Sequence, residues 1–510
     1  MKRIVIITIS LWISIFTVRA IELAEDTIPV ALRLQERYNL YHLFVKTYTE
    51  NPSLKHYSVD TDLTTFGVSY DWRHESKALE PSKGDGYKGF TIGADAYKRL
   101  SHKKVVWGYA TYDKDIVKNV RWNSTAHVDK LYPYIIGNDN VGDMKCERYA
   151  FLGGYAQQYA WGSWGLEMEY LAGHQFRTID PRPRIVTSDL MINTGASLNL
   201  TERYLLGIKF GIESYKQRAG FTFYDELGAD PQYILSGLGN IFERFNESKL
   251  QMDYRSKKLL MGINLLPRAK NGLYLDLEAE MSGLERILTS ANNVPINSYK
   301  EAKGVLHTGY WSTISEQQRW GINIDGSYQR RKGKSHIIGD PKGGSYPIEA
   351  RLPMFGMEIV TSSVTGYYEQ QLESWWWHCS PKISYQKSSI AIAYPQKQLD
   401  DHNLDYSISG GWGIKWHKNM ADINLSFGYI QHINSSLVLP KLLIRQSLLE
   451  HIEESYSQLS HDRVYCTISP KIFFQVSKNM GLELNMAYRM VHLAPQNIAH
   501  QLAGGVTLVF

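Results

Sequence analysis

The chain has 510 residues, of which 43% are hydrophobic and 12% aromatic, and its mean hydropathy is -0.32. This composition excludes a disordered chain, because it carries enough apolar surface to form a core. The formal net charge of +5, from 56 Lys and Arg against 51 Asp and Glu, indicates no particular attraction to nucleic acid.

Residues 1–20 are typical of a secretory signal peptide. A short basic start precedes an apolar run from Ile4 to Val18, and Ala20 closes a small-residue cleavage site. The alternative is a membrane anchor, but the run is shorter than the ~20 apolar residues of a spanning helix, and a cleavage site follows it. No later stretch is long and apolar enough for a helical span. We therefore expect export, with the mature protein in the outer membrane of a Gram-negative bacterium.

A helical pattern follows the leader. Residues 31–49 carry apolar and aromatic side chains near helical spacing, and Asn51-Pro52-Ser53 ends the pattern. The side chains with this spacing are Leu34, Tyr38, Tyr41, Phe44, Val45 and Tyr48. We expect residues 21–60 to form a short helical segment outside the main fold.

Most of the remaining chain alternates between apolar and polar residues. Leu482, Leu484 and Met486 share one face of an extended segment, and Glu483 and Asn485 share the other. Many segments reach about ten residues, the length of a tilted transmembrane strand, whereas soluble strands peak near five or six. The pattern therefore favours a transmembrane β-barrel over a soluble sandwich, with apolar side chains toward lipid. The same alternation recurs at 164–170, 206–212, 273–278, 422–429 and 501–510.

The connections between segments alternate in length, as in outer-membrane barrels with short periplasmic turns and long outer loops. Eight short turns predict about 18 strands when both termini are periplasmic, and we expect 14–18 strands in all. Residues 61–510 would then form an all-β antiparallel barrel, with residues 21–60 as a periplasmic segment or plug. The short turns are expected at 101–103, 162–163, 199–202, 269–272, 315–317, 387–389, 418–420 and 477–479, and the long links at 115–146, 218–248, 332–373 and 434–461.

One long link contains a second helical pattern. Residues 440–459 begin with Pro440 and place leucines on one face, which predicts an amphipathic helix in an outer loop. Its apolar face would rest on the barrel's own rim or on a partner protein.

Aromatic residues gather near segment ends, which is typical of the aromatic girdles at membrane interfaces. A group beside the link 332–373 would lie at an outer loop, where one face could stack on a sugar or porphyrin ring; the girdle alone also explains it. We interpret Phe510, the last residue, as a membrane-insertion signal. The outer-loop aromatic candidates are Tyr367, Tyr368, Trp375, Trp376 and Trp377.

The polar faces of the strands would project into the lumen. Their charges could set cation preference in a channel or bind a cationic cargo, but any water-filled barrel is lined with hydrated or paired charge. The lumen-facing candidates are Glu167, Glu169, Lys209, Asp276, Glu278, Glu280, Asp422, Glu483 and Arg489.

The searches for catalytic and metal motifs find little. There is no HExxH or GxSxG, and Gly333-Lys334-Ser335 resembles the end of a phosphate loop whose first Gly is replaced by Tyr328. We expect that the protein is not an enzyme and holds no metal and no cofactor. A barrel hydrolase with Ser and His, or a barrel protease with carboxylates, stays open, because the catalytic residues of such enzymes lie far apart in the sequence and form no local motif. Cys146, Cys379 and Cys466 lack CxxC spacing; isolated thiols are favoured, and a bridge stays open.

The segment ending in Asn51-Pro52-Ser53-Leu54, the long alternating strands and Phe510 resemble an uncharacterised outer-membrane β-barrel family of Bacteroidota. That resemblance implies an accessory role in nutrient uptake, beside a TonB-dependent receptor and surface lipoproteins. The Asn-Pro pair is also similar to the fatty-acid channel superfamily, whose plugged barrels have 14 strands, fewer than the count of about 18 that the short turns give. Neither resemblance supplies functional residues. The function hypotheses are an uptake channel or accessory subunit, a hydrophobic-substrate channel, and a structural barrel without transport.

Overall fold

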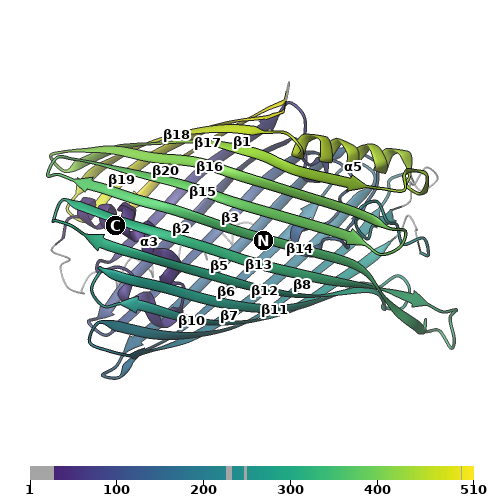
Figure 1. Ribbon diagram of the computed structural model, residues 1–510, viewed down its shortest axis with the longest axis horizontal. Coiled ribbons are helices and arrows are strands. Elements are labelled where there is room, and N and C mark those ends of the chain that lie inside the picture. The colour runs from purple at the N-terminus through teal and green to yellow at the C-terminus, as the bar shows by residue number, and fades with distance from the viewer. Residues whose placement is uncertain (1–27, 226–231, 246–249, 495–496) are drawn as a thin grey trace, which may run out of the picture.

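The fold is a closed β-barrel (Figure 1). The computed structural model of the protein describes residues 28–225, 232–245, 250–494 and 497–510, so the predicted signal peptide lies outside the described residues. An 18-stranded antiparallel sheet closes where the last strand pairs with the first, Leu508 opposite Phe66. The predicted barrel is confirmed, at the upper end of the expected strand number.

Each long strand pairs with its neighbours along the chain, and β3 pairs with β5 and β8 with β10 because the short β4 and β9 form a separate sheet. Most strands exceed the length typical of soluble proteins. The barrel strands are β1 (Leu63–Glu75), β2 (Gly86–Ser101), β3 (Lys104–Val120), β5 (Gly142–Gln158), β6 (Gly162–Phe176), β7 (Arg182–Asn199), β8 (Tyr204–Thr222), β10 (Gln251–Pro267), β11 (Gly272–Leu288), β12 (Val294–Thr313), β13 (Gln318–Ile338), β14 (Ile348–Gln371), β15 (Trp375–Ile392), β16 (Lys397–Trp416), β17 (Asn419–Val438), β18 (Arg463–Ser477), β19 (Met480–Ala494) and β20 (Asn497–Val509).

Six of the eight predicted short turns coincide with connections at one end of the barrel, where β1 also begins, and the turn predicted at 162–163 lies at residues 159–161 of the same end, because Gly162 already begins β6. We call this the turn end and the opposite end the loop end. The turn predicted at 387–389 is wrong, because these residues lie within β15 and Ser389 Oγ donates to Asp400 on the adjacent strand over 2.6 Å. The true turn is at residues 372–374. Three consecutive polar residues within a strand, Lys387, Ser388 and Ser389, were mistaken for a connection.

The long link predicted at 332–373 is also wrong. Strand β13 continues to Ile338 and β14 begins at Ile348, so the connection spans only residues 339–347. The hairpin is so long that its tip projects beyond the rim at the right of Figure 1. The cause of the error is the row of lysines, arginines and hydroxyl side chains on these strands, which resembles loop composition.

The predicted helical segments are confirmed. The first comprises helices α2 (Val30–Tyr38) and α3 (Leu40–Lys46) and the 3-10 turns η1 (Thr47–Thr49) and η2 (Pro52–Tyr57). The second is the 3-10 turn η4 (Lys441–Leu443) with helix α5 (Gln446–Leu459) at the loop end. Among the described residues, no helix is long and apolar enough to cross a membrane. The remaining small elements are η3 (Pro81–Lys83), α4 (Val128–Leu131), β4 (Ile136–Gly137) and β9 (Tyr233–Ile234).

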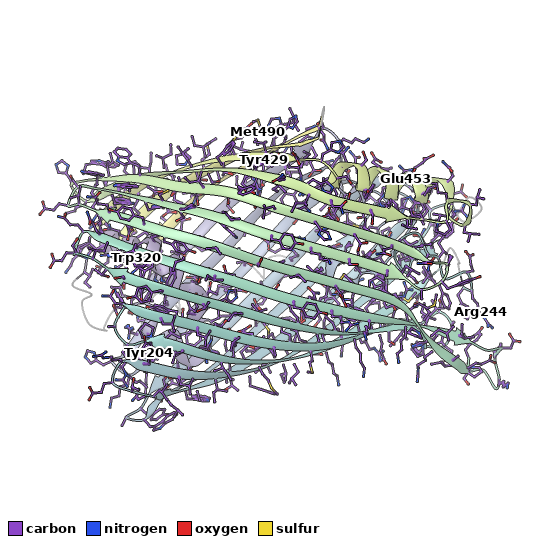
Figure 2. All side chains as sticks on the ribbon, in the orientation of Figure 1. Tyr204, Arg244, Trp320, Tyr429, Glu453 and Met490 are labelled. Atoms are coloured by element: carbon purple, nitrogen blue, oxygen red, sulfur yellow. The ribbon has the colours of Figure 1, made fainter. Side chains whose placement is uncertain are left out.

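The outer face of the barrel carries the apolar side of the alternation. Leu166, Met168 and Tyr170 on β6 are 41%, 53% and 40% exposed, although they are large and apolar. Side chains cover this outer face, and the labelled Tyr204 and Trp320 lie toward the turn end (Figure 2). An exposed apolar belt around a closed barrel is the surface expected toward lipid.

Candidate functional site

The described N-terminal segment, residues 28–62, lies within the turn end of the barrel; we call it the plug. Pro52 and Ser53 rest directly on the backbone of β6 at Gly165, where an added Cβ would lie 2.4 Å from the carbonyl carbon of Pro52. Gly195 lies opposite Gly165 on β7, and an added Cβ there would lie 1.8 Å from Oδ1 of Asn51. Glycine is required at both positions because the plug approaches the wall closely.

Asn51 joins this contact to the lumen wall. Its Oδ1 accepts from the backbone N–H of Ser53 over 3.0 Å, which caps η2, and its Nδ2 donates to Oδ1 of Asn264 over 2.9 Å. Asn264 in turn donates to Asp276 on the adjacent strand. Asn51 and Asn264 are 0% and 1% exposed, so their side-chain amides form hydrogen bonds with each other in place of water.

An aromatic cluster holds α3 against the wall. Phe44 lies 5.1 Å from both Tyr274 and Trp311, measured between ring centroids. Tyr48 is fully buried and its hydroxyl donates to Asn323. Aromatic packing of this kind contributes both area burial and preferred ring geometry.

Helix α2 covers the junction between the first and last strands. Leu34 packs in a cluster with Leu63 at the start of β1 and Val509 at the end of β20. The backbone N–H of Val30 donates to the carbonyl of Lys478 over 3.2 Å. Helix α2 therefore contacts both sides of the barrel seam.

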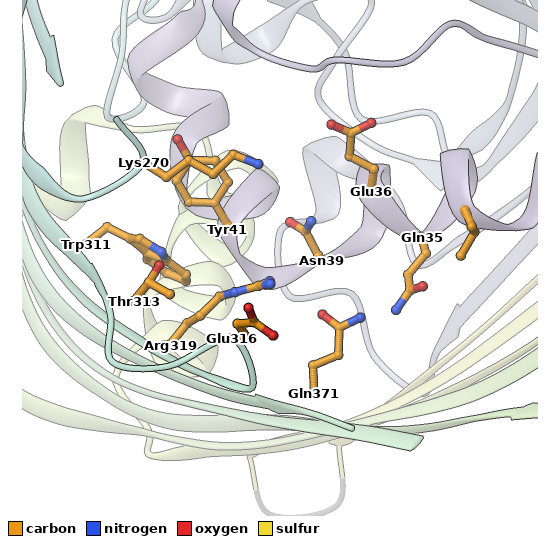
Figure 3. A pocket seen from close by; sticks show the side chains of 11 residues that line it. Gln35, Glu36, Asn39, Tyr41, Lys270, Trp311, Thr313, Glu316, Arg319 and Gln371 are labelled. Carbon is orange, nitrogen blue, oxygen red and sulfur yellow. The ribbon is translucent and has the colours of Figure 1, made fainter. Parts of the chain in front are cut away.

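A cavity of about 430 Å³ separates part of the plug from the wall (Figure 3). Its lining includes both acidic and basic side chains, among them Glu36 on the plug and Arg319 on β13. Arg319 also pairs with Glu369 at 3.3 Å. The side chains that line it are Leu32, Gln35, Glu36, Asn39 and Tyr41 from the plug, and Lys270, Trp311, Thr313, Glu316, Arg319 and Gln371 from the wall.

Burial changes the titration of two plug side chains. Desolvation, followed by the neighbouring Arg37, lowers the pKa of His42 to about 4, so its imidazole is neutral at pH 7. Burial also lowers the pKa of the Lys55 ammonium. Burial of the plug in the lumen therefore disfavours the charged forms of both side chains.

Two further segments, residues 121–141 and 232–245, fold inward at the loop end; together we call them the outer cap. They join through the β4–β9 pair, Ile136 opposite Ile234. Tyr134 is 1% exposed, and its hydroxyl donates to the carbonyls of Ser298 and Lys334 on the wall over 3.2 Å. The lumen is therefore occupied at both ends by the chain's own segments.

Arg286 on β11 binds both parts of the outer cap. Its guanidinium is 0% exposed and donates to the carbonyls of Ile135 over 3.2 Å and Leu235 over 2.7 Å. Nε donates to Asn297 over 3.0 Å. A buried guanidinium satisfies several orphan carbonyls at once through its rigid set of donors.

A row of ion pairs follows the wall between the plug and the outer cap; we call it the charge row. Lys209 Nζ lies 2.6 Å from Glu278 and 4.0 Å from Glu50 of the plug. Farther along, Lys258 Nζ lies 3.7 Å from Glu280 and 2.6 Å from Glu213.

The charge row ends at the outer cap. Glu213 also contacts Lys130 of the cap, whose Nζ lies 2.6 Å from Asp189. The row thus brings together three of the predicted lumen residues, Lys209, Glu278 and Glu280.

The other predicted lumen residues also lie on the barrel wall, but they are not part of the charge row. Glu167 accepts from Trp107 Nε1 over 2.7 Å, and Glu169 accepts from the hydroxyl of Tyr109. Asp276 holds Asn264 beneath the plug.

Three more predicted lumen residues lie on the last strands and on β17. Asp422 and Glu483 line a cavity of about 280 Å³ beside Tyr38. The guanidinium carbon of Arg489 lies 5.0 Å from the ring centroid of Tyr465. Asp422, Glu483 and Arg489 therefore do not form one site with the other predicted lumen residues.

The outer-loop placement of the aromatic candidates is wrong, because they flank the turn 372–374 at the turn end. Tyr367 packs against Phe44 of the plug at 5.6 Å, and Trp376 packs in the cluster under α2. Alternate side chains on a strand face opposite ways, so Trp375 and Trp377 face outward. Trp377 packs against Tyr368 at 5.2 Å.

The two remaining sequence features are placed as follows. Phe510 extends the seam, because its backbone N–H donates to the carbonyl of Thr64 over 2.8 Å. Cys146, Cys379 and Cys466 are all free. In the part of the chain that the structure describes, no group of three His, Cys, Asp or Glu side chains is placed to hold a metal ion.

Sequence reasoning missed the outer cap, Arg286 and the glycines under the plug. Inward-facing Gly165 and Gly195 give no signal alone, because glycine also occurs at outward positions such as Gly153. Their pairing on adjacent strands becomes visible only once the register is known.

A family model described as "Family of unknown function (DUF6850)" matches residues 52–510. The chain belongs to this family. A search among curated proteins finds no match. The DUF6850 match begins at Pro52, so it includes η2 and the whole barrel.

Solved structures with some similarity include receptors for ferric compounds and a toluene transporter. The ferric-catecholate import receptor Fiu from E. coli K12 is 10% identical, with 87% of this chain and 81% of that chain covered and a TM-score of 0.36. BauA, the ferric preacinetobactin receptor from Acinetobacter baumannii, is 6% identical, with 89% and 80% covered and a TM-score of 0.39. The Ralstonia pickettii toluene transporter TbuX is 9% identical, with 91% and 92% covered and a TM-score of 0.27.

Proposed function

We propose that this protein resides in the outer membrane and works in nutrient uptake as a gated channel. The apolar outer belt supports the location, because only a closed barrel satisfies every strand backbone group within lipid. The polar inner wall, including Glu167, Glu169 and the charge row, supports a water-filled path.

The observation that carries the proposal is the occupation of the lumen at both ends. A barrel of 16–18 strands is wide enough for an aqueous channel when its interior is empty. Here the plug and the outer cap fill the two ends, so conduction requires both to move. Each is held by a small set of buried polar contacts, centred on Asn51 and Arg286, and such contacts have discrete broken and formed states.

Single-channel currents in planar lipid bilayers test this gate. We compare the wild-type protein, a variant lacking residues 28–57, the Arg286→Met variant, and a variant with both changes. We expect low conductance in the wild type, small increases in either single variant, and a large, stable pore only in the combined variant. Arg218→Met is the matched control, since Arg218 is exposed and its ion pair within the described part of the chain is with Asp253. Low conductance in the combined variant would refute the channel.

A second candidate is a non-conducting accessory subunit that supports a TonB-dependent receptor or surface lipoproteins. The filled lumen favours it, because a scaffold needs no open path. This accessory role goes together with the predicted origin of the protein in Bacteroidota. Gentle-detergent purification from native outer membranes distinguishes the two: a receptor recovered in fixed ratio supports the accessory role, and recovery of the protein alone supports an independent channel.

A further inference from the structure

An apolar cavity of about 190 Å³ lies at the loop end, between the outer cap and helix α5. The cap supplies Trp122, Ile135 and Leu235 to its lining, and α5 supplies Leu448 and Ile452. Leu448 and Leu235 belong to the same buried cluster, so the cavity is part of a packed interior and not a gap between loose loops.

Helix α5 is fixed over this cavity by polar contacts along its length. Lys77 pairs with Glu454 at 3.1 Å, and Tyr456 accepts from Ser435 over 3.0 Å. Near the end of the helix, Gln458 Oε1 accepts from Nδ2 of Asn497 over 2.7 Å. These contacts join α5 to three separate parts of the barrel rim, so the cavity has a defined shape.

Most polar groups around the cavity are already paired. Lys83 lies 3.2 Å from Glu80 and 3.0 Å from Asp129, so both carboxylates at the cavity edge share one cationic partner. Ser455 donates to the carbonyl of His451 over 3.0 Å. These groups therefore need no polar partner from a ligand.

Two ring nitrogens in the cavity lining are exceptions. The indole N–H of Trp122 has no hydrogen-bond partner among the described residues, although Trp122 is only 1% exposed. Nδ1 of His451 is likewise buried and without a described partner. An unpaired buried donor costs free energy of about 1–3 kcal/mol, so a bound molecule that supplies the missing acceptor is stabilised there.

The imidazole of His451 is uncharged at neutral pH. Burial, followed by the nearby Arg121, lowers its pKa to about 4. With Glu80 and Asp129 paired, the cavity presents apolar walls and two neutral nitrogen groups. This lining suits an uncharged ligand.

We propose that the cavity binds a small, uncharged, single-ring molecule that carries one oxygen acceptor, such as an aromatic ketone or ester. The apolar walls would hold the ring, and the oxygen would accept from the indole N–H of Trp122 beside His451. The size follows from the volume, since an apolar cavity of about 150 Å³ accommodates benzene. The proposal does not depend on conduction, because binding at the loop end requires no open lumen.

Equilibrium binding to the full-length protein in lipid nanodiscs tests the proposal. The probes are acetophenone and ethylbenzene, which share a ring and similar shape but differ in the carbonyl oxygen, and empty nanodiscs correct for partition into lipid. We expect saturable binding of one acetophenone per protein, at least threefold tighter than ethylbenzene, because only the ketone can accept the hydrogen bond. Absence of saturable binding, or equal affinity for both probes, would overturn the proposal.

Two variants locate the site. Trp122→Phe keeps the ring but removes the N–H, so we expect acetophenone binding to weaken roughly three- to tenfold while ethylbenzene binding changes less than twofold. Trp161→Phe, at the exposed turn before β6, is the matched control and leaves both unchanged. Ser455→Trp fills the cavity from α5 and abolishes binding of both probes.

Heat-modifiable gel migration shows whether each variant folds, and the test stays decisive if one variant does not. If Trp122→Phe is lost, the contrast between the probes on the wild-type protein and the effect of Ser455→Trp carry the test. Unchanged binding in folded Ser455→Trp, or an equal loss in Trp122→Phe and Trp161→Phe, contradicts the site.

Discussion

At the scale of single residues, the plug depends on the absence of a side chain at Gly165. A Cβ at this position would lie 2.4 Å from the backbone of Pro52, which cannot move aside as a flexible side chain could. Overpacking of this kind costs about 1–3 kcal/mol. We expect Gly165→Ala to displace η2 and to raise the amide hydrogen-exchange rate of residues 53–57 roughly tenfold.

The matched substitution is Gly153→Ala on the neighbouring strand β5, where an added Cβ meets nothing within 4 Å. Exchange in η2 should keep its wild-type rate in this variant. Equal exchange rates in the two variants would mean that the close contact at Gly165 does not hold the plug.

The pH dependence of the outer cap also rests on one residue. Burial, followed by the nearby Lys130, lowers the pKa of His127 from 6.5 to about 4, and Nδ1 lies 2.9 Å from the hydroxyl of Tyr215. The released cap therefore takes up a proton at a higher pH than the docked cap. The contribution of His127 to docking should be fully present above pH 6.5, weaken as the pH falls toward about 4, and change little below that.

Hydrogen exchange of residues 126–136 between pH 8 and pH 4, corrected for the intrinsic pH dependence of exchange, measures this effect. His127→Asn can keep a hydrogen bond near the Nδ1 position but cannot titrate, so we expect a flatter profile. His102→Asn, at an exposed turn on the opposite end, should keep the wild-type profile. A wild-type profile in His127→Asn would assign the pH dependence to other groups.

At the scale of elements, the charge row connects strands β8, β10 and β11 to the outer cap. Glu213 is its branch point, because it pairs with Lys258 at 2.6 Å and also contacts Lys130. Removing one partner of a buried ion pair commonly costs about 3–5 kcal/mol, because the remaining charge is left uncompensated. Lys130 keeps Asp189, so we expect Glu213→Gln to cost less than that.

The measurement is protease cleavage of residues 121–141 in the folded protein. Glu213→Gln should increase the cleavage rate several-fold. Glu358→Gln is the control, since its pair with Arg330 is about half exposed on both sides, and exposed pairs contribute about 0–1 kcal/mol. If both variants are cleaved at the wild-type rate, the charge row does not hold the cap.

The strands could be predicted from the sequence because alternation is a local property. Leu166, Met168 and Tyr170 already define one face without knowledge of any neighbour. The plug helices were also predictable from the spacing of residues 31–49. By contrast, the turn at 372–374 was missed because the Lys, Arg and hydroxyl side chains on β13 and β14 resemble loop composition, so residues 332–373 were taken as one long link.

The contacts that make the candidate site could not be predicted in this way. Arg286, Ile135 and Leu235 lie far apart in the chain and meet only because the cap folds into the lumen. No periodicity marks an inward-folding loop. The sequence did predict the inward charges, but not that Lys209, Glu278 and Glu280 would form one row.

At the scale of the whole molecule, the plug and outer cap act in series. Releasing one leaves the other in the path, so permeability to a large solute should require both changes. Cells that produce the variant lacking residues 28–57 together with Arg286→Met should become sensitive to a large hydrophilic antibiotic such as vancomycin. Cells with either change alone should resemble wild type.

Equal surface amounts of the variants, measured by immunoblot of outer-membrane fractions, are the control for this comparison. Sensitivity in the plug deletion alone would show that the outer cap does not block the path. Resistance in all variants would favour the accessory role over the channel.

The position of α2 across the seam has a consequence for biogenesis. Leu63 and Val509, which both pack against Leu34, come from opposite ends of the barrel sequence and become neighbours only when β20 pairs with β1. The docking surface of the helix is therefore incomplete during insertion and is created by the final step of assembly. A docked N-terminal helix thus distinguishes a finished barrel from an open intermediate, and gives the cell a surface by which quality control could tell the two apart.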